Sequence, residues 1–244
     1  MATRNLLFKR QYKINDFISI YIPTVGEILE GIDGNGCEDD YYGLVSSLTA
    51  MPIDLMVQLD DIGQDFTQIN EYELFLSLFR GVQSQDTRLI FGDLDISKFE
   101  LALDEQSQML VYLNPETGAK IDRAIHEQIA NALRFIHHFE KNTKTAGNEE
   151  ARKYLIERAR KKQRRARNRQ EASQLESLIV AMVNTEQYKY GFEETKELSI
   201  YQFNESVRQV IKKVDYDNKM YGIYTGTIST KDLSQDDLNW LVHK

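Results

Sequence analysis

The sequence predicts an α+β fold that is mostly helical, with a small N-terminal strand and a β-hairpin packed on helices. Apolar residues recur at a spacing of three or four through most of the 244 residues, which is typical of helices. Strict alternation of apolar and polar residues is confined to the region between Phe99 and Leu113. A composition of 41 % hydrophobic and 28 % charged residues fits a globular chain with a sizeable core.

The chain opens with a short strand over residues 16–22 (DFISIYI), which is apolar, β-branched and ended by Pro23. Thr24 and Glu27 then form a capping-box pattern that starts a helix. The turn-rich segment 31–36 (GIDGNG) ends this helix.

Three more helices are expected before the hairpin. Two are short and apolar, and the third begins at the capping pattern of Asn70 and Glu73. Their sequences are YYGLVSSLTA (41–50), PIDLMVQLDDI (52–62) and ELFLSLF (73–79).

The alternating region predicts a β-hairpin that turns at residues 104–108 (DEQSQ) and returns through 109–113 (MLVYL). This turn lacks the Asn-Gly or Asp-Gly pair of a two-residue hairpin. The preceding segment 92–96 (GDLDI) is a candidate for an irregular strand.

An apolar stripe follows Gly118 and continues to Phe139, so a long helix is expected there; its members are Ile121, Ile125, Ile129, Leu133 and Ile136. The polar segment 141–148 (KNTKTAGN) is the best candidate for a boundary. We therefore expect an acidic N-terminal α+β region over 1–142 and a helical C-terminal region over 148–244.

The C-terminal region should consist of helices joined by short connectors. A basic helix over about 148–170 and a short apolar helix over 174–183 come first, followed by a connector at 188–195. Ser199 and Gln202 form another capping box, which opens a helix through Val214 and past Tyr216. A last amphipathic turn or two over 234–242 carries Trp240, the only tryptophan.

The helix after Ser199 has a broad apolar arc, which we expect to be its buried face with Trp240 folding back on it. The residues of this arc are Tyr201, Phe203, Val207, Val210, Ile211 and Val214.

The net charge of −8 conceals a strong segregation of charge. Residues 14–79 contain thirteen acidic and no basic residues, whereas residues 152–169 contain ten basic residues and one acid, Glu157. Such a basic helix can engage an acidic protein surface, in its own chain or in a neighbouring copy. A solvated helix face and nucleic-acid binding are the alternatives, and the shortage of nearby aromatic residues argues against base stacking.

The sequence offers little support for catalysis or metal binding. None of the four histidines, His126, His137, His138 and His243, lies near a Gly-x-Ser-x-Gly motif, and no phosphate-binding glycine loop is present. Asp33 begins a segment like a calcium loop but lacks the later oxygen ligands, and Asp93 and Asp95 have nothing to position them against a substrate. We therefore expect a non-enzymatic protein without cofactor or metal.

Compartment signals point to a soluble, intracellular protein. No apolar run approaches the roughly 20 residues that span a bilayer, and the N-terminus lacks the apolar core of a signal peptide. Cys37 is the only cysteine, so it cannot form an intramolecular disulfide.

Two stretches have a more distinctive pattern. The first is SIYIPTVGEILE (19–30), and the second is a helix with Ile-Tyr-Gln-Phe at 200–203 and a tyrosine-rich segment after it. The matching C-terminal residues are Ile200, Tyr201, Gln202, Phe203, Ser206, Arg208, Tyr216, Tyr221, Tyr224, Gly226 and Trp240. This pattern resembles small proteins from the tail-gene clusters of tailed phages and prophages of Gram-positive bacteria, described as tail or baseplate assembly chaperones.

The resemblance implies a non-enzymatic assembly factor in the cytoplasm of the infected or lysogenic host. Such a factor binds the tape measure or baseplate subunits until assembly buries them, and it is absent from the finished virion. Self-association is compatible with this role, whereas a membrane is not implied and the net charge argues against nucleic acid. The alternatives are a structural virion component of the baseplate, neck or head-completion apparatus and, third, a nucleic-acid-binding phage protein.

The candidate interaction residues combine the basic helix with the C-terminal pattern. They are Arg158, Arg160, Lys161, Lys162, Arg164, Arg165, Arg167, Arg169, Tyr201, Phe203, Arg208, Tyr221 and Trp240.

Overall fold

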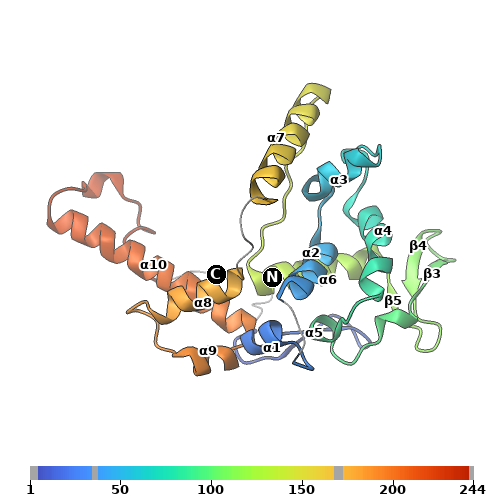
Figure 1. The fold of residues 1–244 in the computed structure, drawn as a ribbon, viewed down its shortest axis with the longest axis horizontal. Coiled ribbons are helices and arrows are strands. Elements are labelled where there is room, and N and C mark those ends of the chain that lie inside the picture. The colour runs from blue at the N-terminus through green and yellow to red at the C-terminus, as the bar shows by residue number, and fades with distance from the viewer. Residues whose placement is uncertain (1–4, 35–37, 168–172, 242–244) are drawn as a thin grey trace.

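The computed structural model describes residues 5–34, 38–167 and 173–241, and it confirms an α+β fold dominated by helices (Figure 1). The chain begins with a two-stranded antiparallel sheet of β1 (Gln11–Lys13) and β2 (Ser19–Tyr21), in which Tyr12 lies opposite Ile20. β2 is the strand predicted within residues 16–22, whereas β1 was not predicted. Only three residues of mixed polarity form β1, so it has no periodicity of its own and depends on its pairing with β2.

Helix α1 (Val25–Glu30) begins at the predicted capping box. The Glu27 N–H donates to Thr24 Oγ1 at 3.1 Å, and the Thr24 N–H donates to Glu27 Oε2 at 2.6 Å. The helix ends at Gly31, whose φ of 69° lies in the left-handed region that glycine adopts without strain. Both ends of this helix are therefore specified locally.

The next helices form one side of the core. They are α2 (Glu38–Thr49), a 3₁₀ turn (Pro52–Leu55), α3 (Met56–Asp61), α4 (Glu71–Gln83) and α5 (Arg88–Phe91). The predicted cap of α4 is confirmed. Asn70 Oδ1 accepts from the Tyr72 and Glu73 N–H groups, and the Glu73 carboxylate accepts from the Asn70 N–H.

The predicted hairpin is confirmed as β3 (Glu100–Leu103) and β4 (Leu110–Leu113), and β5 (Lys120–Ile121) adds a third antiparallel strand in the order β3-β4-β5. The Asp104 carboxylate closes the turn by accepting from the backbone and side chain of Ser107, which replaces the missing Asn-Gly signal. The prediction of an irregular strand at 92–96 was wrong. Asp95 caps a 3₁₀ turn there (Ile96–Lys98), because its carboxylate accepts from the Ser97 N–H.

Helix α6 (Arg123–His137) is the central helix of the fold. Helices α2 and α4 pack against it on one side, and the start of α10 packs on another (Figure 1). Within this helix the predicted apolar stripe is confirmed, since Ile129, Leu133 and Ile136 are buried. The prediction was wrong for Ile121, which precedes the helix and lies in β5, where it pairs with Tyr112 of β4. Asp122 caps the helix by accepting from the Ile125 N–H at 2.9 Å.

The C-terminal region consists of α7 (Glu149–Arg167), α8 (Gln174–Val183), α9 (Phe192–Glu197), α10 (Ile200–Tyr224) and a 3₁₀ turn (Thr230–Asp232). α9 occupies part of the expected connector, and α10 extends ten residues beyond Val214. The amphipathic segment expected at the end is a series of hydrogen-bonded turns over the described residues 234–241, with the Asp237 N–H donating to the Ser234 carbonyl.

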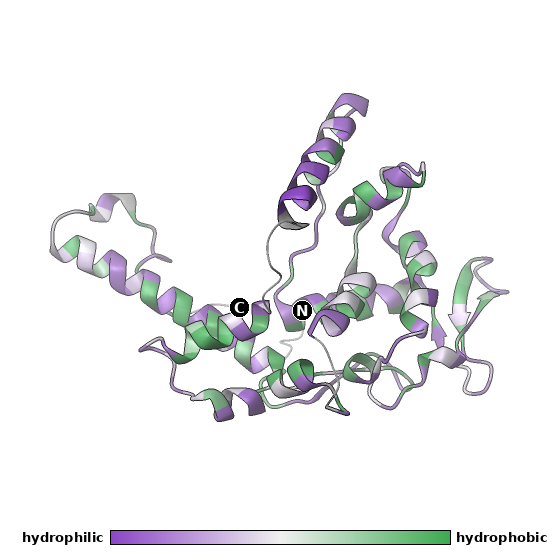
Figure 2. Ribbon diagram, viewed as in Figure 1, coloured by the Kyte–Doolittle hydropathy of each residue, from purple (hydrophilic) through white to green (hydrophobic). Residues whose placement is uncertain are grey.

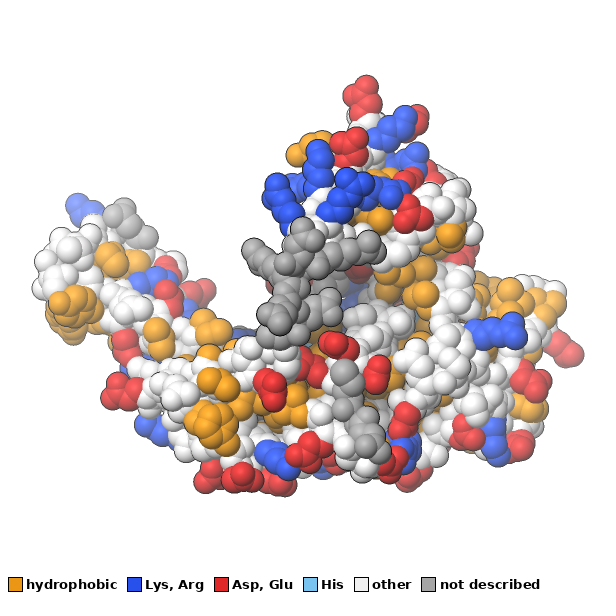
Figure 3. Space-filling view, viewed as in Figure 1, with side chains coloured by type: hydrophobic (Ala, Val, Ile, Leu, Met, Phe, Trp, Pro, Cys, Tyr) orange, Lys and Arg blue, Asp and Glu red, His pale blue; other side chains and the backbone are white. Residues whose placement is uncertain are grey.

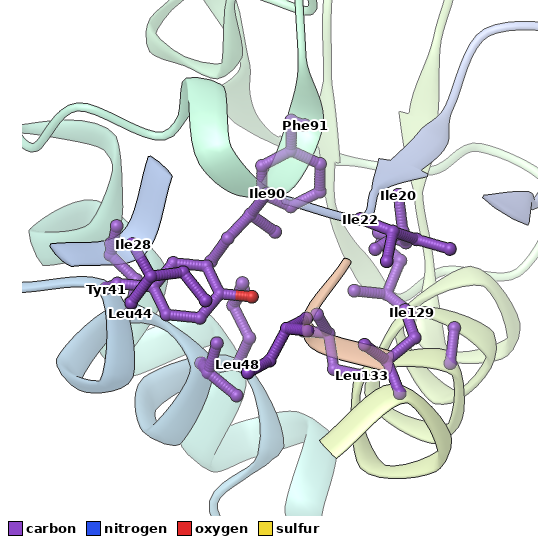
Figure 4. Close-up of a cluster of buried hydrophobic side chains, with 14 of the residues drawn as sticks. Ile20, Ile22, Ile28, Tyr41, Leu44, Leu48, Ile90, Phe91, Ile129 and Leu133 are labelled. Atoms are coloured by element: carbon purple, nitrogen blue, oxygen red, sulfur yellow. The ribbon is translucent and has the colours of Figure 1, made fainter. Parts of the chain in front are cut away.

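The main hydrophobic cluster joins both halves of the chain. Figure 4 shows the part of it that the N-terminal half contributes. Residues of β2, α1, α2, α5 and α6 pack there together with α8 and the start of α10. A smaller cluster beneath α3 contains Ile156 of α7 beside Ile53, Leu59, Phe66 and Leu74. The division of the chain into regions 1–142 and 148–244 stays a prediction. Buried side chains from both regions pack together in the same clusters.

Candidate interaction surfaces

The start of α10 is fixed in the core by its cap and by two aromatic side chains. The Ser199 hydroxyl accepts from the Gln202 N–H at 3.2 Å, and the Gln202 carboxamide accepts from the Ser199 N–H at 2.9 Å. Tyr201 and Phe203 are completely buried, and the Tyr201 ring stacks on Phe135 of α6. These two residues were candidate interaction residues, but their burial makes them the support of the helix and not part of its surface.

Backbone hydrogen bonds also hold this helix start to the N-terminal half. The Val25 N–H donates to the Leu198 carbonyl at 2.9 Å, and the Ile200 N–H donates to the Pro23 carbonyl at 2.8 Å. Two segments about 175 residues apart are thereby joined in a strand-like bridge. The direction in which α10 leaves the body is therefore fixed at its origin.

Beyond Val210, α10 extends away from the body, as Figure 1 shows at its left. We call residues 211–241 the C-terminal arm. Its exposed hydrophobic side chains include Ile211 (62 % exposed), Tyr221 (71 %) and Tyr224 (81 %). A rigid helix thus presents aliphatic and aromatic side chains to solvent.

The predicted buried face of α10 is confirmed only at its first residues. Tyr201 and Phe203 are buried, and Val207 and Val210 pack partly buried against the main cluster. The prediction was wrong for Ile211, which is largely exposed and is not among the side chains packed against the main cluster. Val214 is half-buried.

The end of the arm folds back along α10. The Thr227 and Ile228 N–H groups both donate to the Gly222 carbonyl, and a β-carbon at Gly222 would lie 2.5 Å from Ile228 Cδ1. A larger residue at this position would therefore require the Ile228 side chain to move.

Polar side chains of α10 then hold the returning segment. Lys219 pairs with Asp237 at 2.6 Å and keeps the pKa of that carboxyl below its ordinary value. The Gln209 amide donates to the Trp240 carbonyl at 2.7 Å. The predicted return of Trp240 to α10 is confirmed for its backbone, but its ring is 45 % exposed and does not cover Phe203. Arg208, another candidate, lies near the start of the arm with its guanidinium 3.9 Å from Glu205.

The basic helix α7 projects beside α3, as Figures 1 and 2 show. Arg160 pairs with Asp60 at 2.7 Å and with Asp61 at 2.6 Å, and Arg152 lies 3.6 Å from Asp65. These ion pairs, with the burial of Ile156, confirm that the basic helix contacts the acidic segment of its own chain.

Five further cations of α7 are exposed and form what we call the basic face: Arg158, Lys161, Lys162, Arg164 and Arg165 (Figure 3). Lys153 is also exposed and pairs with Glu149 on the same helix at 2.8 Å. Lys161 lies 3.9 Å from Glu157 on the same helix. The side chain of Arg167 and all of Arg169 lie outside the described residues. The basic face is compatible with a solvated surface or with a further acidic partner.

A groove of about 730 Å³ runs between α1, α8 and α9. Val25, Leu29 and Ile179 supply apolar lining, and Lys196 at the rim pairs with Glu30 at 2.5 Å. This groove was not predicted, because it exists only where α1 meets α8 and α9, which are distant from it in sequence.

Several buried polar groups inside the fold have structural partners. Arg134 donates to Glu71 at 2.6 Å and to the Thr49 carbonyl at 2.5 Å, and Lys141 pairs with the same carboxylate. These cations hold the pKa of Glu71 below its ordinary value although burial opposes them. A partly buried carboxylate with two cationic partners, one of them on α6, thus connects α4 to α6.

Two histidines of α6 are buried and uncharged. Burial lowers the pKa of His126 to about 4 and the pKa of His137 to about 3. His126 Nε2 lies 3.3 Å from the Leu48 carbonyl, and His137 Nε2 lies 2.9 Å from the Tyr41 hydroxyl. Both rings pack in the aromatic core, with His126 stacked on Phe75.

The other acidic candidates also have local partners. Asp33 pairs with Arg88 at 2.5 Å, and Asp95 caps the turn at Ser97. Within the described parts of the chain, no three His, Cys, Asp or Glu side chains lie together as a metal site would require. None of the described helices is long and apolar enough to cross a bilayer.

Comparison with known proteins gives one family. Residues 162–243 match the family model of the YomV second domain, which derives from a Bacillus prophage. This match supports a phage protein. It covers about a third of the chain. No curated protein and no solved structure matches the chain.

The YomV-like segment, residues 162–243, begins in the last turns of α7 and contains α8, α9 and α10. Within the described residues it includes the whole C-terminal arm and three members of the basic face, Lys162, Arg164 and Arg165. The match therefore includes the C-terminal arm and part of the basic face, together with α8, α9 and the buried start of α10.

Proposed function

We propose that this chain is a non-enzymatic phage tail assembly chaperone, which binds tape-measure or baseplate proteins in the host cytoplasm while the virion assembles. The observation that carries the proposal is the C-terminal arm. Its origin is fixed in the core by Tyr201 and Phe203, whereas Tyr221 and Tyr224 near its end are exposed. The phage-derived family match covers the same segment.

The exposed side chains of the arm suit a helical or otherwise apolar client. Tyrosine offers a large amphipathic contact area at little cost in side-chain entropy, and tyrosine is enriched in protein interfaces. Ion pairs within the helix, Lys213–Asp217 and Lys219–Asp215, give the same element a polar rim that keeps it soluble before a client binds.

The rigid origin of the arm also supports a binding role. A preformed helix loses less conformational entropy on binding than a segment that must first fold. An exposed apolar surface on a fixed helix is costly in water unless a partner covers it during part of the chain's life. The client of an assembly chaperone would cover such a surface for part of the time.

The proposal is tested by co-expressing the chain with the tape-measure protein, and separately with each baseplate protein, of the same phage. The parent chain should keep one of these clients soluble and co-purify with it. The double variant Tyr221→Ser/Tyr224→Ser should fold normally, because both side chains are exposed, and should recover at least tenfold less soluble client.

The matched control is Tyr154→Ser, which removes an equally exposed tyrosine from α7. This variant should retain the client as the parent does. Failure of the parent to bind any tape-measure or baseplate protein would overturn the proposal, and so would full binding by the double variant.

A further inference from the structure

Strand β3 lies at the outer edge of its sheet, where its second side has no neighbouring strand in the described fold (Figure 1). The Asp104 N–H donates to the Met109 carbonyl, which makes this a hydrogen-bonded pair of the hairpin. Alternation along an antiparallel ladder then turns the backbone groups of Glu100 and Ala102 toward β4. The N–H and C=O groups of Leu101 and Leu103 consequently point away from the sheet.

The hydrogen bonds between β4 and β5 lead independently to the same orientation of the β3 backbone groups. The Asn114 N–H donates to the Ala119 carbonyl, so Tyr112 and Asn114 face β5. Leu113 must then face β3, which makes Glu100 and Leu113 a hydrogen-bonded pair. Four outward backbone groups of β3 are thus available at the edge.

The same edge carries an exposed apolar surface. Leu101, Leu103 and Leu110 share one face of the sheet with Tyr112, whose ring packs 4.5 Å from Phe79. Leu101 is 52 % exposed and Leu103 is 58 % exposed. Figure 3 shows hydrophobic side chains gathered over β3 and β4 at the right-hand end of the molecule. Open edges of natural sheets are usually protected by charges, prolines or bulges, so leucines here call for a partner.

We propose that β3 pairs antiparallel with β3 of a second copy of this chain, with Leu101 of each copy opposite Leu103 of the other. This register joins the two residues whose backbone groups point outward, and it forms four new hydrogen bonds. Ala102 lies opposite Ala102 of the second copy on the two-fold axis. The two sheets become one six-stranded sheet, and the three leucines of each copy merge into one apolar surface.

The self-complementarity of the edge is what selects a second copy as its occupant. Opposed residues must lie on the same face of the sheet, and this register satisfies that rule while placing leucine against leucine. It also places Glu100 opposite Asp104 of the second copy. The Asp104 carboxylate is already partnered by Lys120 at 3.2 Å, so the pairing does not leave two unbalanced charges in contact.

A four-residue edge gives a small interface and a weak dimer, with a dissociation constant expected between roughly 1 μM and 1 mM. Analytical ultracentrifugation of the full chain across this range should show reversible dimerisation. Leu101→Lys and Leu103→Lys should each shift the dissociation constant upward at least tenfold. Phe17→Lys, at an equally exposed position in the other hairpin, is the matched control and should dimerise as the parent does.

Disulfide cross-linking tests the register. In a chain with Cys37→Ser, the single variant Ala102→Cys should form a disulfide dimer on oxidation, because directly opposed, non-hydrogen-bonded residues have Cα atoms about 4.5 Å apart. Leu101→Cys and Leu103→Cys are matched controls. In this register each of these residues lies diagonally across from the same residue of the second copy, with about 7–8 Å between them. A disulfide cannot span that separation, so neither variant should cross-link alone.

Two results would overturn the proposal. One is a parent chain that stays monomeric up to about 1 mM, which would leave the edge to a strand of another protein. The other is equal cross-linking of Leu101→Cys and Ala102→Cys, which would exclude this register. Neither measurement depends on the tail-assembly function proposed above.

Discussion

Arg160 of α7 contacts Asp60 and Asp61 of α3, with N–O distances of 2.7 and 2.6 Å across one hundred residues of sequence. Each of the three side chains is a third or more exposed. The contact connects the most basic segment of the chain with the segment that lacks basic residues. It positions the basic helix and leaves the five cations of the basic face turned to solvent.

The first prediction concerns this contact. Arg160→Ala should loosen α7 from α3 but leave the global stability nearly unchanged, because exposed ion pairs are weak. Amide hydrogen exchange in α7 should become faster, and raising the salt concentration should have the same effect on the parent. Arg164→Ala, from the basic face, is the control and should exchange like the parent. Equal exchange in both variants would show that Arg160 does not hold the helix.

The second prediction separates the origin of α10 from the arm. Phe203→Ala should destabilise the chain by roughly 3–5 kcal/mol, because its ring is completely buried. Ile211→Ala should change the free energy of unfolding by less than about 0.5 kcal/mol, since its side chain is largely exposed. Urea denaturation of both variants measures the difference. Similar losses of stability in the two variants would contradict the division of α10 into a buried origin and an exposed arm.

The third prediction is a loss of stability between pH 7 and pH 5. The pKa values of His126 and His137 are about 4 and 3 in the folded chain, below the unfolded value of about 6.5. As the pH falls below 6.5, the unfolded chain binds protons first, so the folded state loses stability. Two such histidines together should cost about 3–4 kcal/mol at pH 5.

Urea denaturation at pH 7 and pH 5 measures this loss. The double variant His126→Gln/His137→Gln should be less stable than the parent at pH 7 but should change much less between the two pH values. The carboxyl groups whose pKa values are lowered by ion pairs, such as Glu71, titrate below this window. A parent chain equally stable at both pH values would show that the two histidines are accessible to protons in the folded state.

The predictions that held depended mostly on local signals. The capping boxes at Thr24, Asn70 and Ser199 each depend on side chains three residues apart, and all three open helices. The hairpin was predicted from alternation alone. The contact between α7 and α3 is long-range, yet the segregation of charge was strong enough to indicate it.

Features made by distant segments were not predictable. Strand β5 has only two residues and exists because β4 offers it an edge. The exposure of Ile211 depends on which other elements reach α10 at that point, and the periodicity of α10 does not record this. The groove between α1, α8 and α9 requires three helices to be placed together.

The account is tested most directly by counting copies of this chain in purified virions of the phage that encodes it. Quantitative mass spectrometry should find the chain in infected cells, bound to an unassembled tail protein, and less than one copy per mature particle. A fixed, stoichiometric copy number in the mature particle would contradict an assembly chaperone and identify a structural component of the virion.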